Sequence, residues 1–186
     1  MELTQDTKYN VLLYLDFKQI MKLGTIDKNY NYISNDINFW VYKINYDFDT
    51  NLSKKEILDF DGGKWLEDYY DDDITNITKQ YNKIALIYEA LKIIQDIVNE
   101  LMELVIHEDS YYANKTIIPF LPKKVKSEIV SEENLQFTYD GEDFLIYYSI
   151  DDNPYNMLSY IIKEDELYRL FFRYILNSPQ LAFHLM

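Results

Sequence analysis

The chain has 186 residues, of which 48% are hydrophobic and 17% aromatic, fractions too high for a polypeptide that stays disordered. The lack of cysteine excludes disulfides and thiolate metal sites, and only 4 glycines and 4 prolines favour helices over a β-sandwich or barrel. A formal net charge of -14 repels phosphate backbones and anionic lipids, so we expect no binding to nucleic acid or membranes.

The first 46 residues predict three short helices. Thr4 is a candidate N-cap for a helix through residue 14, a second helix covers residues 18–23 and ends at Gly24, and a third covers residues 27–34. Three helices of this length cannot enclose a core by themselves. Their surplus apolar surface must therefore pack on the rest of the chain or on another protein.

The order of apolar and acidic residues in this segment follows a known module. It consists of Leu3-Thr4, Leu15-Asp16, Ile20-Met21, Leu23, Ile26, Ile33 and the ending SNDINFW, in which Asp36 precedes Trp40. This order resembles the F-box, the helical module by which substrate receptors dock on the Skp1 adaptor of cullin-type ubiquitin ligases. The family pattern differs from this chain at Thr4, Thr25, Asp27 and Tyr30.

The resemblance implies a partner and a set of docking residues. The partner would be a Skp1-like adaptor, and the docking surface would be shaped by Leu3, Leu12, Leu15, Ile20, Leu23, Ile26 and Trp40. The bias toward Asn, Ile, Lys and Tyr is similar to that of F-box-like proteins of large DNA viruses, which implies the host cytosol or nucleus. The alternative is that residues 1–50 are the helical part of one globular core.

Residues 47–74 predict an acidic linker or short helices. Within it, residues 57–63 resemble the first motif of haloacid-dehalogenase-type phosphotransferases, with Asp59 as nucleophile and Asp61 as acid/base. That chemistry requires the end of a buried parallel strand, so we prefer a solvated turn. The acidic run of residues 71–73 could attract a divalent cation, but a charged lead-in to a helix is preferred, and no metal site is predicted.

Residues 75–186 predict an α+β domain that could bind a target protein. A long amphipathic helix is expected over residues 78–107, with an apolar stripe of Ile84, Ile87, Leu91, Ile94, Val98, Leu101 and Val105. A β-hairpin with its turn at Asp140-Gly141 would place Phe137 opposite Phe144 and Leu135 opposite Ile146. One helix is expected to begin at Pro154 and another to cover residues 164–177.

The chain shows no recognisable catalytic constellation. It lacks a phosphate-binding glycine loop, and its two histidines lie outside any catalytic motif, so we expect no enzyme activity and no cofactor. No signal peptide or membrane span is expected either. The sequence thus favours a mainly helical α+β protein that acts as a non-catalytic adaptor in the cytoplasm. The alternative is an acidic structural or self-associating protein with no link to ubiquitin.

Overall fold

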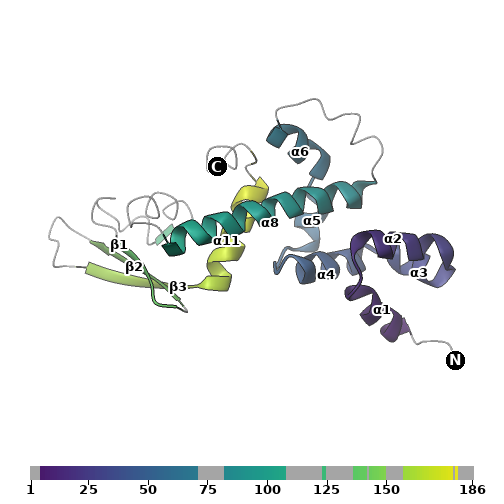
Figure 1. Cartoon of the computed structure of the whole chain (residues 1–186), viewed down its shortest axis with the longest axis horizontal. Helices are drawn as coiled ribbons and strands as arrows, with labels where there is room; N and C mark the ends of the chain where they lie inside the picture. The colour runs from purple at the N-terminus through teal and green to yellow at the C-terminus, as the bar shows by residue number, and fades with distance from the viewer. Residues whose placement is uncertain are drawn as a thin grey trace. The chain divides into compact units, whose positions relative to one another are not determined.

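The computed structural model describes residues 5–70, 82–107, 123–124, 136–141, 143–149, 157–177 and 179. Within these ranges the chain forms eight helices and one three-stranded antiparallel sheet (Figure 1). The predicted mainly helical fold with a minor β component is confirmed. The chain divides into two compact units, Met1–Ile93 and Ile94–Met186, each treated by itself below. The division that we expected at residues 46 and 74 stays a prediction.

The first unit begins with four helices: α1 (Gln5–Leu13), α2 (Phe17–Ile26), α3 (Lys28–Ser34) and α4 (Ile37–Asp47). An aspartate precedes each of the last three and accepts a hydrogen bond from a backbone N–H of the first turn. Asp16 forms a capping box with Gln19, Asp27 caps α3, and Asp36 caps α4. Local side-chain chemistry therefore sets where these helices begin.

Gly24 does not end the second helix, so that prediction is wrong. It is buried inside α2, where a Cβ atom would collide with Ser34 Oγ of α3. The missing side chain lets α2 and α3 approach closely, which is the reason for glycine here rather than a helix stop. The Asn31 side chain also donates to Gly24 O, at 2.9 Å.

The predicted linker contains two helices, α5 (Lys54–Asp59) and α6 (Gly62–Tyr70). The solvated turn that we preferred agrees with the break between α5 and α6, where Asp59 and Asp61 are exposed, although Ile57 is buried. The requirement of the phosphotransferase motif is not met. Asp59 is the last residue of a helix rather than the end of a buried parallel strand, so this segment lacks the geometry which that chemistry needs.

The long helix α8 (Lys83–His107) is present as predicted for the residues described. Its first half lies in the first unit, where Ile87, Tyr88 and Leu91 are buried. A Cβ atom at Gly62 would lie 2.6 Å from the carbonyl carbon and oxygen of Leu86, so α6 approaches the backbone of α8 at a glycine. The apolar stripe continues through the second half of the helix, in the second unit.

The second unit contains strands β1 (Gln136–Tyr139), β2 (Asp143–Ser149) and β3 (Met157–Lys163), in the order β1-β2-β3, and helix α11 (Glu164–Asn177). The bounds of α11 match the prediction. Its buried residues are Leu167, Phe171, Phe172, Ile175 and Leu176. Acidic residues lie in the first turn of α11, where their negative charges interact favourably with the positive end of the helix dipole.

The predicted hairpin exists, but its register is wrong by two residues. Phe137 pairs with Ile146, and Tyr139 pairs with Phe144. The backbone N–H of Asp140 donates to Asp143 O at 3.2 Å, so Asp140 belongs to the closing pair rather than to the turn centre. Gly141 takes a φ of +101°, the positive value that type I′ and type II′ hairpin turns both require at their first central position.

A strand replaces the helix that we expected from Pro154. β3 pairs along its whole length with β2, from Asp143 opposite Lys163 to Ser149 opposite Met157. This pairing satisfies the backbone N–H and C=O groups on the outer side of β2. A proline at the start of a segment is a local feature and does not predict such pairing with another strand. Several expectations lie outside the described residues: Leu3, Thr4, Leu135, Pro154 and the acidic run at 71–73.

Candidate functional site

The predicted docking residues divide into buried and accessible ones. Leu12 and Ile20 are 0% exposed and Trp40 is 2% exposed, so their side chains belong to the core of the first unit. Leu15 and Leu23 are half-buried, and Ile26 is 71% exposed. In this structure, therefore, a partner could touch Leu15, Leu23 and Ile26 directly, whereas the buried three could act only by holding the helices in place. Their part in docking stays a prediction.

Trp40 lies at the centre of an aromatic cluster. Its ring centroid lies 5.5 Å from that of Phe17, 5.1 Å from Phe39 and 5.8 Å from Tyr88. Its indole Nε1 donates to the backbone oxygen of Ser34 at 2.7 Å, which satisfies the one polar atom of the side chain. The cluster connects α2, α4 and the first half of α8. Residues 17–40 thus share a core with the chain around residue 88.

A buried polar network lies beside this cluster. Lys43 is 2% exposed, and its ammonium donates to Leu13 O at 2.8 Å and forms an ion pair with Asp47. The other oxygen of Asp47, Oδ2, accepts from the Tyr88 hydroxyl at 3.0 Å. Burial raises the pKa of Tyr88, and the charge of Asp47 and this hydrogen bond raise it further.

The network joins three elements rather than forming a reaction centre. It caps a free carbonyl at the end of α1 and links α4 to α8. An ammonium that is almost fully enclosed cannot reach a dissolved substrate, and its partners match the requirement that a buried charge be paired. We therefore interpret it as structural.

The accessible apolar surface of α1 and α4 was missed by the sequence interpretation. Tyr14 is 80% exposed, Tyr42 is 56%, Tyr46 is 52% and Val11 is 41%. The ring of Tyr14, in the turn after α1, meets the ring of Tyr46 on α4 edge to face with centroids 6.2 Å apart, which joins the end of α1 to α4 in one surface. We call these four residues the α1/α4 tyrosine face. The four-residue spacing of Tyr42 and Tyr46 is the signal that could have located it.

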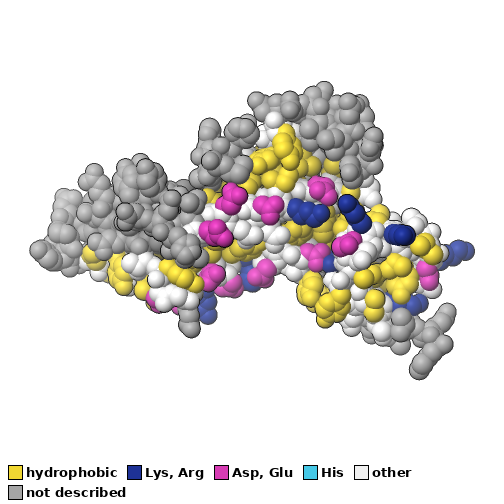
Figure 2. Space-filling view, in the orientation of Figure 1, with side chains coloured by type: hydrophobic (Ala, Val, Ile, Leu, Met, Phe, Trp, Pro, Cys, Tyr) yellow, Lys and Arg dark blue, Asp and Glu magenta, His cyan; other side chains and the backbone are white. Residues whose placement is uncertain are grey.

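Figure 2 shows hydrophobic side chains at the surface of the N-terminal helices, and also beside α6 and α8. Of the ten most exposed large hydrophobic residues in the described part of the chain, six lie on α1–α4 or in the turn after α1: Val11, Tyr14, Ile26, Tyr32, Tyr42 and Tyr46. Single exposed apolar residues are ordinary, but contacting ones mark interaction surfaces. Tyrosine in particular is enriched among the residues that dominate binding energy at protein interfaces.

Among the described residues, no group of three or more His, Asp or Glu side chains could hold a metal ion. No helix in the described ranges has the length and apolar character needed to cross a bilayer. Comparisons of the chain with protein-family models, curated proteins and solved structures found no match. Functional inference therefore depends on the residues and contacts above.

Proposed function

We propose that the chain is a non-catalytic adaptor whose N-terminal helices dock on a Skp1-type protein of a cullin ubiquitin ligase, in the cytosol or nucleus. The remaining α+β part would capture a target protein. The concentration of exposed hydrophobic side chains on α1–α4 is the observation that carries the proposal. The F-box-like residue order supplies the identity of the partner.

The exposed residues fit the way in which protein interfaces gain affinity. A few large side chains at the centre of an interface contribute most of the binding free energy, through burial of apolar area. Tyr14 and Tyr46 are already in contact, so ordering them on binding costs little side-chain entropy. Ile26 and the half-buried Leu23, one helical turn apart on α2, supply an aliphatic counterpart.

The proposal is tested by mixing the full chain with a purified Skp1-type adaptor and measuring complex formation by size-exclusion chromatography with light scattering. We expect a one-to-one complex at micromolar concentration. Ile26→Asp and Tyr14→Ala should each weaken it at least tenfold, because residues central to an interface cost 2 kcal/mol or more when removed. Leu58→Asp, at an exposed site of α5, is the matched control and should bind normally. The absence of a complex when both proteins are mixed at about 50 micromolar would refute the proposal.

A second candidate is an acidic structural protein that associates with itself. It is favoured by the contacts of Phe17, Trp40 and Phe48 with Tyr88, because they join the N-terminal helices to the chain beyond residue 80 in one core. Light scattering of the chain alone decides between the two. A dimer or larger assembly that persists at low micromolar concentration, together with no adaptor binding, would support this candidate.

A further inference from the structure

The sheet of the second unit ends on a strand that has one partner. All seven residues of β3 pair with β2 in one unbroken antiparallel register, from Met157 to Lys163. No described strand pairs with the opposite edge of β3 (Figure 1). The backbone N–H and C=O groups of alternate residues therefore point outward along that edge, in the arrangement that another extended chain needs for hydrogen bonding.

This edge lacks the features that usually prevent strand addition. Proteins protect the edges of sheets with prolines, bulges, short strands or charged side chains. Between its two end residues β3 has no charge, no proline and no bulge, and Lys163 stands at its last position, opposite Asp143 of β2. β1, at the other edge of the sheet, pairs over four residues only. β3 is therefore the longer and less protected of the two edges.

Apolar side chains lie beside this edge on both faces of the sheet. On one face Ile161 is 55% exposed and pairs with the half-buried Leu145. On the other face Leu158 is 41% exposed, whereas Ile162 is 1% exposed and belongs to the core. Successive side chains of an added strand would point alternately to the two faces and cover Ile161 and Leu158. Burial of this area favours a segment with apolar side chains.

Negative charge lies next to the same strand. α11 begins directly after β3, and its first turn carries three exposed acids, of which Asp165 forms an ion pair with Arg169. Burial raises the pKa of Tyr160, in the middle of β3, and the charge of Glu166 raises it further. The carboxylate of Glu166 is therefore close enough to the strand for a cationic side chain of an added segment to reach it. Together with the net charge of -14, this favours a basic segment.

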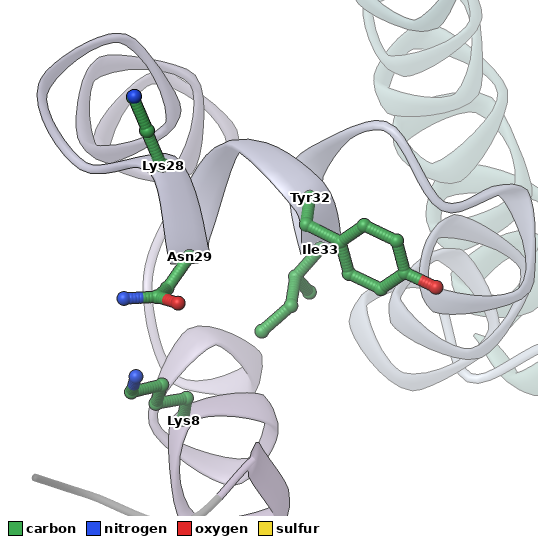
Figure 3. Close-up of a pocket in the computed structure, with 5 residues that line it drawn as sticks. All are labelled: Lys8, Lys28, Asn29, Tyr32 and Ile33. Atoms are coloured by element: carbon green, nitrogen blue, oxygen red, sulfur yellow. The ribbon is translucent and has the colours of Figure 1, made fainter.

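The hollow between α1 and α3 in the first unit offers no comparable site (Figure 3). The ammonium groups of Lys8 and Lys28 point away from each other, and the ring of Tyr32 is directed away from Lys8. Ile33 is 3% exposed and adds little apolar surface to the lining. These groups do not converge on one ligand, whereas the outward backbone groups of β3 lie in one row.

We propose that the outer edge of β3 binds an extended basic segment of a target protein by strand addition. The backbone of the segment hydrogen-bonds to β3, its apolar side chains cover Ile161 and Leu158, and a lysine or arginine lies near Glu166. The inference rests on the proposed function for the role of the bound segment, since it gives the target-capturing part of the chain a defined site. It uses none of the residues of the α1/α4 tyrosine face.

The test is an NMR titration of the ¹⁵N-labelled full chain with the capped peptide Lys-Val-Thr-Val-Thr-Val-Lys, which matches the length of β3. Saturable shifts of the β3 amides are expected, with a Kd of roughly a millimolar or tighter. The outward amides of β3 should also exchange more slowly with deuterium when the peptide is bound. The absence of saturable shifts up to about 5 millimolar peptide would overturn the proposal.

Two altered peptides separate the backbone from the charge contribution without changing the protein. Replacing the central valine with proline removes a backbone donor and should weaken binding about tenfold. Replacing both lysines with glutamate should weaken binding as well, and the difference should shrink as the salt concentration rises. Equal binding by the proline peptide, or by the glutamate peptide at low salt, would refute the proposal.

Variants of the chain locate the site. Ile161→Lys should weaken peptide binding about fivefold or more, because it removes a partly exposed apolar contact and adds a like charge. Thr138→Lys, at an exposed position on the same face of β1, is the matched control and should bind normally. Glu166→Gln should weaken binding about two- to fivefold, the range for exposed ion pairs, whereas Glu100→Gln on α8 should not. Equal losses within either pair would reduce the effect to net charge and refute the site.

Light scattering of the chain alone tests whether a second copy occupies this edge instead. A dimer at the concentration of the titration that Ile161→Lys converts to a monomer would show pairing between copies and overturn the proposal. A monomer leaves the edge open, as the proposal requires. Because the titration contains no adaptor, a failure of peptide binding and a failure of adaptor binding are observed separately.

Discussion

Trp40 distinguishes a core residue from an interface residue, and its contacts give a definite expectation. The ring is 2% exposed and touches three other rings, so Trp40→Ala would leave a large cavity in the first unit. Truncations of this kind lower the free energy of unfolding by about 3 to 5 kcal/mol. Trp40→Phe keeps most of the volume but leaves Ser34 O without its donor, which costs about 1 to 3 kcal/mol.

The assay is urea unfolding of the full chain at 25 °C, followed by far-UV circular dichroism. Tyr42→Ala is the matched control, since Tyr42 lies on the same helix but is 56% exposed, and its change should stay within about 0.5 kcal/mol. A decrease of less than about 1 kcal/mol in the free energy of unfolding of Trp40→Ala would show that Trp40 does not hold the core together. That result, together with a loss of adaptor binding, would make Trp40 an interface residue after all.

Three further predictions concern the same unit. Lys43→Met should lower the free energy of unfolding by about 1 to 3 kcal/mol in urea titrations, because Asp47 loses its cation; adding Asp47→Leu should restore part of it. The pKa of Tyr88 is raised above the value of about 10 in the unfolded chain, so its contribution to stability is complete below pH 10 and falls as the pH rises further. Tyr88→Phe should therefore show a flatter decline between pH 9 and pH 11 or so. Gly62→Ala should lower the thermal midpoint through its clash with Leu86 backbone atoms, at a cost of about 1 to 3 kcal/mol, and an unchanged midpoint would contradict the close approach.

Helix positions were predictable wherever the signal is local. Asp16 and Asp27 cap the helices that follow them, and the acidic first turn of α11 precedes an apolar stripe, so the chain carries these starts in neighbouring residues. The apolar stripe of α8 also predicts a helix from the local sequence, because its residues recur at steps of three and four along the helix. Even α4, which was not predicted, has a local cap at Asp36.

Hairpin register and the identity of β3 were not accessible in the same way. A shift of the turn centre by one residue, from Asp140-Gly141 to the pair that starts at Gly141, changes every cross-strand partner. β3 forms because its backbone hydrogen-bonds to the edge of β2. The residues 157–163 alone do not predict which strand they pair with.

The sequence by itself determined the helical character of the chain, the starts of its capped helices and its acidity, because these depend on residues a few positions apart. Only the tertiary structure decided which apolar side chains are available to a partner. Leu12, Ile20 and Trp40 have the same hydrophobic character as Tyr14 and Ile26, yet the first three are enclosed and the last two are open. Trp40, for example, packs against Tyr88 of α8, which is distant in sequence, and burial depends on neighbours in space rather than on the residue's own chemistry.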